Sequence, residues 1–97
     1  MPYIQVIEYT TSKWDQIEAL VQQYEKDTEG RRTSDATRVC LDRDRANHYV
    51  AVVEFPSYEA AMENNNLEET ATLAEAIMPL CDEPPVFHNL DVIRVMG

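Results

Sequence analysis

Residues 48–55 constrain the fold more than any other stretch, because they form a strand that is apolar on both faces. The segment reads His-Tyr-Val-Ala-Val-Val-Glu-Phe, rich in the β-branched and aromatic residues that strands favour. Val50 and Val52 fall on one face, and the other carries Tyr49, Ala51, Val53 and Phe55. An antiparallel strand with one wet face alternates apolar with polar side chains. We therefore expect both faces of this strand to be covered.

Three other segments carry the same kind of strand pattern. They are residues 3–9, 36–41 and 86–95. The first places Ile4 and Val6 on one face, and the last places Leu90 and Val92 together. A charged turn without glycine, residues 42–47, joins the second strand to the third, and residues 81–85 are predicted to be a loop.

Two helical regions separate these strands. Ser12 is the expected N-cap of the first, and Gly30 suits the left-handed position after its last turn. Its apolar stripe recurs at helical spacing and consists of Trp14, Ile17, Leu20, Val21 and Tyr24. The second region begins at the N-cap Ser57, is interrupted by the asparagines at 64–66, and resumes over residues 67–78.

The order β-α-β-β-α-β over residues 1–97 predicts one α+β domain, a ferredoxin-like sandwich. In that fold a four-stranded antiparallel sheet carries both helices on one face. The helices leave the second apolar face uncovered, and soluble monomers avoid exposing such a surface. A second copy of the same sheet is the simplest cover, so we expect a homodimer.

Charge and composition exclude several classes of function. The 18 acidic residues outnumber the 8 basic ones, and a net charge of −10 disfavours nucleic acid and anionic membranes as partners. The chain shows no membrane-length apolar run and no secretory signal, and Cys40 and Cys81 are isolated, which favours a soluble cytoplasmic protein with reduced thiols. It has neither metal-ligand spacing nor a glycine-rich phosphate loop, so no metal or cofactor is expected.

The stretch Val53-Glu54-Phe55-Pro56-Ser57-Tyr58-Glu59-Ala60-Ala61 is the most informative motif. It resembles the strand-end motif of the dimeric α+β barrel superfamily, and within it of the antibiotic-biosynthesis-monooxygenase-like proteins. The resemblance extends over nearly the whole chain. It implies that two sheets close into a barrel and that each subunit holds a pocket between its sheet and its helices. Members oxidise polyketide-like aromatics without a cofactor, degrade haem, isomerise small lactones or have no known activity.

The haem-degrading members of that superfamily use an Asn on strand one, a Trp late in the short helix and a His on the next helix. This chain has no Asn in residues 3–9, and Asn64 and Ala74 stand where the Trp and the His would be. The resemblance therefore does not imply haem degradation of that type, and it supplies no matching catalytic set.

Six residues are candidates for the site. His48 and His88 each open a strand and could act as a general base, because imidazole titrates near neutral pH, or simply lie half in water. Asn64 could donate to a substrate carbonyl or could serve only the turn. Trp14, Tyr24 and Phe55 are candidate ligand contacts that could equally be packing residues.

Two functions remain open from the sequence. The first is a dimeric barrel that binds a hydrophobic or aromatic small molecule, as a cofactor-independent monooxygenase or a related enzyme of secondary metabolism. The alternative is a non-catalytic binding or interaction protein of the same fold, with a filled pocket. A cavity lined by Trp14, an Asn and a His favours the first, and a pocket plugged by Trp14, Tyr24 and Phe55 favours the second.

Overall fold

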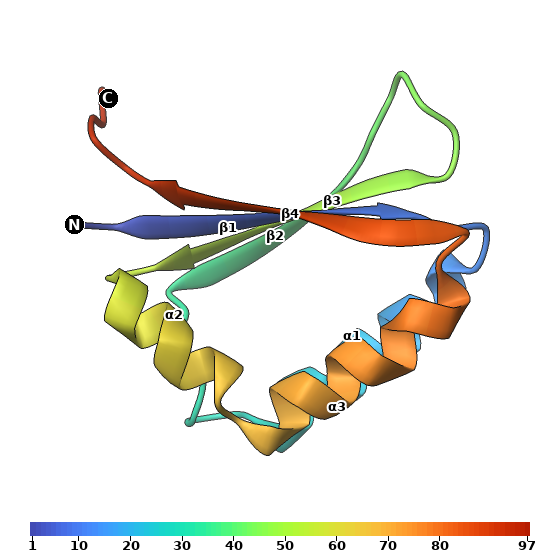
Figure 1. Cartoon of the computed structure of the whole chain (residues 1–97), viewed down its shortest axis with the longest axis horizontal. Helices are drawn as coiled ribbons and strands as arrows, with labels where there is room; N and C mark the ends of the chain where they lie inside the picture. Colours follow the sequence, from blue (N-terminus) through green and yellow to red (C-terminus); the bar gives the residue numbers. More distant parts are fainter.

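The computed structural model describes residues 1–97 and contains one four-stranded antiparallel sheet with all helices on one side (Figure 1). Its elements are β1 (Tyr3–Thr10), α1 (Trp14–Asp27), β2 (Ala36–Leu41), β3 (His48–Phe55), α2 (Tyr58–Asn65), α3 (Glu68–Ile77), a 3-10 turn (Met78–Leu80) and β4 (Glu83–Asp91). The strands are arranged β2-β3-β1-β4. This order confirms the ferredoxin-like α+β fold, with the second helical region divided into α2 and α3. None of the helices combines the length and the apolar character needed to span a membrane.

The sheet has two apolar faces, as the sequence predicted. We call the side toward the helices the inner face; it includes Gln5 and Val53, which pair across β1 and β3 and both line the space beneath the sheet. We call the opposite side the outer face; it includes Val6 and Val52, which are also paired. The other apolar side chains of the outer face are Ile4, Val50, Val86 and Leu90. No helix covers them (Figure 1).

The tightly packed part of the interior lies under α2. Tyr3 and Phe55, paired on the inner face, are 4% and 2% exposed and pack with Ala60 and Ala61 of the helix. Ser57 caps α2 as predicted, because its hydroxyl accepts a hydrogen bond from the Ala60 N–H at 3.1 Å. Only 11 of the 97 residues are buried in the whole chain. One end of the molecule is therefore well packed, while much apolar surface elsewhere is not.

The first helix begins differently from the prediction. Ser12 is not its N-cap: α1 starts at Trp14, and the capping position is Lys13, which makes no side-chain cap bond. The buried hydroxyl of Thr11 accepts from the Lys13 N–H at 2.9 Å and donates to the Leu80 carbonyl at 2.6 Å. These two bonds fix the β1–α1 connection at Thr11, one residue before the predicted cap Ser12. Gly30 has the expected left-handed backbone, φ 79°, but lies in the turn after the cap residue Thr28.

The last strand is also displaced from its predicted range. It runs from Glu83 to Asp91 instead of 86–95, so Pro84 and Pro85 lie within it. Proline lacks a ladder donor and is tolerated mainly at sheet edges, and β4 is an edge strand. The pairing also shifts register between Glu8 and Thr10, opposite this segment. Residues 92–97 leave the sheet as a tail (Figure 1).

Candidate functional site

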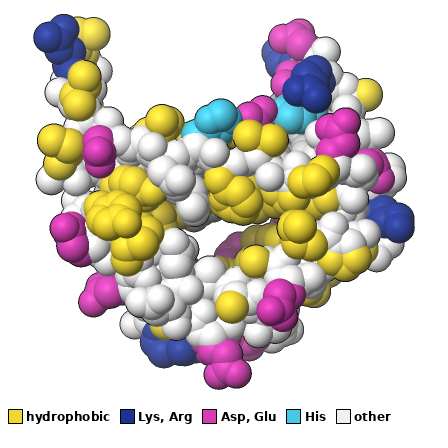
Figure 2. Space-filling model, in the orientation of Figure 1, with side chains coloured by type: hydrophobic (Ala, Val, Ile, Leu, Met, Phe, Trp, Pro, Cys, Tyr) yellow, Lys and Arg dark blue, Asp and Glu magenta, His cyan; other side chains and the backbone are white.

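A cavity of about 350 Å³ lies between the inner face and the helices. Figure 2 shows it as a hollow between the sheet and the helical layer. Thirteen of its 22 lining residues are hydrophobic, and they come from the sheet, α1 and α3. The side chains that form its apolar walls include Ile7, Trp14, Val21, Val53, Phe55 and Leu73. The space is large enough for a small organic molecule, because ligand pockets begin at about 300 Å³.

One end of the cavity is aromatic. Trp14, at the start of α1, stacks on Tyr49 of β3 with ring centroids 4.4 Å apart and planes 10° from parallel. Tyr9 of β1 lies against the same indole at 6.3 Å. Burial, with a contribution from Cys81, raises the pKa of Tyr9 to about 12, so this phenol stays neutral. The indole is thus fixed on one side by Tyr49, while its position in the cavity wall leaves it available to a flat ligand.

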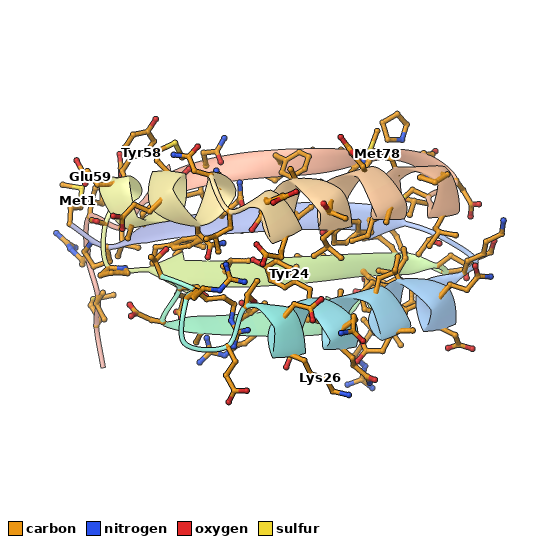
Figure 3. All side chains as sticks on the ribbon, turned by 90° about the horizontal axis from the view of Figure 1, so that it is seen from below. Met1, Tyr24, Lys26, Tyr58, Glu59 and Met78 are labelled. Carbon is orange, nitrogen blue, oxygen red and sulfur yellow. The ribbon has the colours of Figure 1, made fainter.

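The other end of the cavity is polar, and three helices build it. The Tyr24 hydroxyl of α1 lies 2.9 Å from the Thr70 hydroxyl of α3. The Asn64 side chain of α2 donates from Nδ2 to the same phenol oxygen at 3.4 Å, and its Oδ1 accepts from the Thr33 N–H at 3.3 Å. Asn64 is only 7% exposed, which fixes its amide. In Figure 3 Tyr24 lies between α1 and α3, whereas Lys26 points away from the molecule.

The two histidines lie on the outer face, across the sheet from the cavity. His48 Nε2 is 3.0 Å from Glu8 Oε1, and His88 Nε2 is 2.7 Å from Glu8 Oε2. Because a carboxylate only accepts, each imidazole carries its hydrogen on Nε2. The Thr10 hydroxyl is 3.4 Å from His48 Nδ1, which completes the His48 environment. Hydrogen bonds from His88 and then His48 hold the pKa of Glu8 below its usual range.

Acid should weaken the protein through this cluster. A carboxyl whose pKa is lowered in the folded state stabilises the fold at pH values above its ordinary pKa of 4.5. That stabilisation is lost as the pH falls through the lowered pKa of the folded state. We expect Glu8→Gln to be less stable than wild type at neutral pH and to converge with it in acid. Urea denaturation at a series of pH values measures this. The exposed Glu29→Gln is the control and should follow wild type throughout; a Glu8→Gln deficit that is the same at every pH would contradict the prediction.

Four of the six sequence candidates line one cavity. They are Trp14, Tyr24, Phe55 and Asn64. His48 and His88 are brought together, but not with the other four, so their predicted role as a base toward a cavity ligand gains no geometric support. Thr70 and Glu8 are among the residues of these groups that the sequence analysis missed. Thr70 carried a signal, because it shares the apolar face of its helix, and Glu8 carried one as an acid on the same strand face as Ile4 and Val6.

No cluster of three or more His, Cys, Asp or Glu side chains is arranged to hold a metal ion. Cys40 and Cys81 are not joined in a disulfide.

The chain resembles known proteins in its fold. No protein-family model matches the chain, and no curated protein sequence matches it. Solved structures do match over nearly the full length. A protein from Caulobacter crescentus assigned to the antibiotic biosynthesis monooxygenases superposes with a TM-score of 0.84 at 12% identity, covering 96% of this chain and 91% of that one.

This chain has the fold of the antibiotic biosynthesis monooxygenases. Rv0793 from Mycobacterium tuberculosis supports this with a TM-score of 0.83 at 12% identity, covering all of both chains. SnoaB, a cofactor-independent oxygenase from Streptomyces nogalater, gives 0.81 at 12% identity and covers 98% of this chain and 96% of its own. Such low identities establish the shared fold and leave activity to be argued from the site.

Proposed function

We propose that the cavity binds a flat aromatic small molecule. The observation that carries this is the open space of about 350 Å³, aromatic at the Trp14 end and polar at the Tyr24 end. Phe55 and Trp14 are held in the walls by their contacts with Tyr3 and Tyr49, so the space beside them stays empty of side chains. This favours the ligand-binding reading over the alternative in which the protein's own side chains plug the pocket.

The reaction class we propose is cofactor-independent oxygenation of that ligand. SnoaB, which has this fold, is a cofactor-independent oxygenase. In such a reaction the substrate supplies the electrons: dioxygen places one atom on a carbon as a carbonyl, and the other leaves as water with the two hydrogens of that carbon. The groups of this chain that face the substrate are the Tyr24 and Thr70 hydroxyls and the Asn64 amide. They can stabilise negative charge on a substrate oxygen.

We also propose that the protein acts as a homodimer through its outer face. Val86 and Leu90 on this face are about half exposed, and Ile4, Val6, Val50 and Val52 are only partly covered. In Figure 2 projections rise on both sides of this face and make it concave. The C-terminal tail adds further exposed apolar side chains, from Ile93, Val95 and Met96. A second copy would cover these groups, and the two free thiols fit a reducing cytoplasm.

Trp14 fluorescence tests the binding proposal, because Trp14 is the chain's one tryptophan and lines the cavity. We expect a hydroxyanthraquinone to quench its emission in a saturable way. Trp14→Phe should keep the fold and lose the signal, while a thermal shift with the same ligand should persist in the variant.

Free tryptophan at matched absorbance is the control for absorption of light by the ligand. Quenching that never saturates, combined with no thermal shift, would contradict the binding proposal and favour a plugged cavity.

A further inference from the structure

We infer that Tyr24, with Thr70 and Asn64, forms a donor site that recognises an uncharged oxygen acceptor on the ligand and sets its orientation in the cavity. The inference rests on the proposed binding function and adds to it the specificity-determining pair of hydroxyls. It makes Tyr24 and Thr70 together a hydrogen-bonding partner of the ligand and not only part of the wall.

The hydroxyl groups at this polar end carry one hydrogen more than the protein's own hydrogen bonds use. The Asn64 amide donates to the phenol oxygen, so that bond uses none of the hydroxyl hydrogens. Tyr24 and Thr70 share one bond, at 2.9 Å, which uses one of their two hydroxyl hydrogens whichever group donates. Neither hydroxyl has another partner in the protein. One hydroxyl hydrogen is therefore left over in every arrangement of the three groups.

The leftover hydrogen lies where a ligand can reach it. Tyr24, Thr70 and Asn64 all line the same cavity, and Asn64 is almost completely buried. Tyr24 and Thr70 are half-buried, so the leftover hydrogen faces the space of the cavity and no protein acceptor, and a ligand oxygen that reaches it adds one hydrogen bond. Asn64 has a further Nδ2 hydrogen, which makes the site richer in donors than in acceptors. Its best partner is a ketone or quinone oxygen.

The position of this site also fixes the direction in which a ligand lies. Tyr24 is ten residues after Trp14 on α1, which places the two about 15 Å apart along the helix axis. The walls between them are apolar, with Val21 and Leu73 among them. A ligand with an aromatic body and a carbonyl at one end therefore places the oxygen at Tyr24 and its rings toward Trp14.

Two matched ligands and a set of matched variants test the inference. α-Tetralone and tetralin share one bicyclic frame and differ in the carbonyl. Ligand-detected NMR titration of the wild-type protein should show tetralone binding about threefold to tenfold more tightly than tetralin, the range for one neutral hydrogen bond. The double variant Tyr24→Phe/Thr70→Val, which removes both hydroxyl hydrogens, should weaken tetralone binding more than tetralin binding and so lower that preference.

Thr70→Val and Thr70→Ser separate the effect of the Thr70 hydroxyl on binding from the effect of the side chain's shape. Valine keeps the shape and loses the hydroxyl, whereas serine keeps the hydroxyl and loses the methyl group. The valine variant removes one hydroxyl hydrogen, and Tyr24, left without a partner on α3, keeps its own for the ligand. The preference for tetralone should therefore survive in Thr70→Val, in Thr70→Ser and, because Thr70 then keeps its own hydrogen, in Tyr24→Phe. It should fall only when both hydroxyls are removed. Thermal denaturation checks that each variant is folded.

The outcomes distinguish this inference from the proposed function. If both compounds bind equally well to wild type, or if the double variant Tyr24→Phe/Thr70→Val keeps the full preference, the donor site is wrong and the binding proposal stands. If neither compound binds to a folded wild-type protein while a hydroxyanthraquinone does, the inference is again wrong, because the donor should favour any such carbonyl. If none of the three binds, the proposed function fails and the inference falls with it.

Discussion

A lysine at Val52 should separate the protein into single chains. Val52 lies on β3, one of the two central strands of the sheet, and its side chain is on the outer face. It pairs with Val6 of β1 and with Arg38 of β2. In a symmetric dimer each interface gains two added charges, one from each copy. An unpaired buried charge costs about 3 kcal/mol or more, so the dissociation constant should rise by roughly a hundredfold or more. Light scattering measures the mass, which should fall toward the 11.2 kDa of one chain.

The neighbouring residue is a matched control. Val53 lies on the inner face, where it packs against the Tyr3–Phe55 cluster and lines the cavity. Val53→Lys should lower the melting temperature while the folded fraction keeps the mass of the wild-type assembly. Wild-type protein that is already a stable monomer at micromolar concentration, or a Val52→Lys variant of unchanged mass, would contradict assembly through the outer face.

Truncating Phe55 should cause a large loss of folding stability. Phe55 is 2% exposed and packs on Tyr3, with ring centroids 6.2 Å apart, and on Ala60 and Ala61 of α2. Phe55→Ala should lower the free energy of unfolding by about 3–5 kcal/mol. Such a large-to-small change loses the transfer free energy of the removed atoms, and the atoms that line the resulting cavity lose their packing contacts. The expected loss is a large share of the roughly 5–15 kcal/mol typical of a domain. Urea denaturation at fixed protein concentration measures it.

Phe55→Leu separates packing from ligand contact. Leucine keeps most of the buried volume, so we expect a cost of less than about 1.5 kcal/mol and little change in tetralin binding. A Phe55→Ala variant that loses less than 1 kcal/mol would show that the α2 end is not packed as described. A Phe55→Leu variant that keeps its stability but loses ligand binding would instead make Phe55 a contact residue.

The strands and their faces were predictable because they depend on local patterns. Alternation along 48–55 placed Val52 and Val53 on opposite faces, and the register of β3 with β1 confirms this assignment. Ser57 was predictable as a cap because its pattern is not disturbed by tertiary contacts. Both signals are set by residues next to one another in the chain.

The errors arose where distant residues decide. Ser12 had the right chemistry for a cap, but Thr11 is fixed by the Leu80 carbonyl, 69 residues away, and the helix starts after it. Residues 81–85 were predicted to be a loop, yet Pro84 and Pro85 lie in β4 at the edge of the sheet, where their missing donors do no harm. Neither the bond from Thr11 to Leu80 nor the edge position of β4 can be recognised from neighbouring residues in the sequence.

The candidate site also has one part that local patterns predict and another part that depends on contacts between distant residues. The helical stripe brought Trp14 and Tyr24 to one wall of the cavity, as periodicity predicts. The histidines were judged by residue type and by their place at the start of a strand, and strand parity places them on the outer face with Glu8. Counting alternation back from Val50 would have given His48 this position, but its bond to Glu8 depends on the pairing of β1 with β3.

The most direct test of the account is a crystal structure of the wild-type protein grown with α-tetralone. We expect the two rings to lie between Trp14 and Tyr24 within the cavity, with the ketone oxygen within hydrogen-bond distance of the Tyr24 or the Thr70 hydroxyl. A cavity filled by the protein's own side chains, with no ligand in it at saturating concentration, would contradict the claim that this fold holds an open aromatic site.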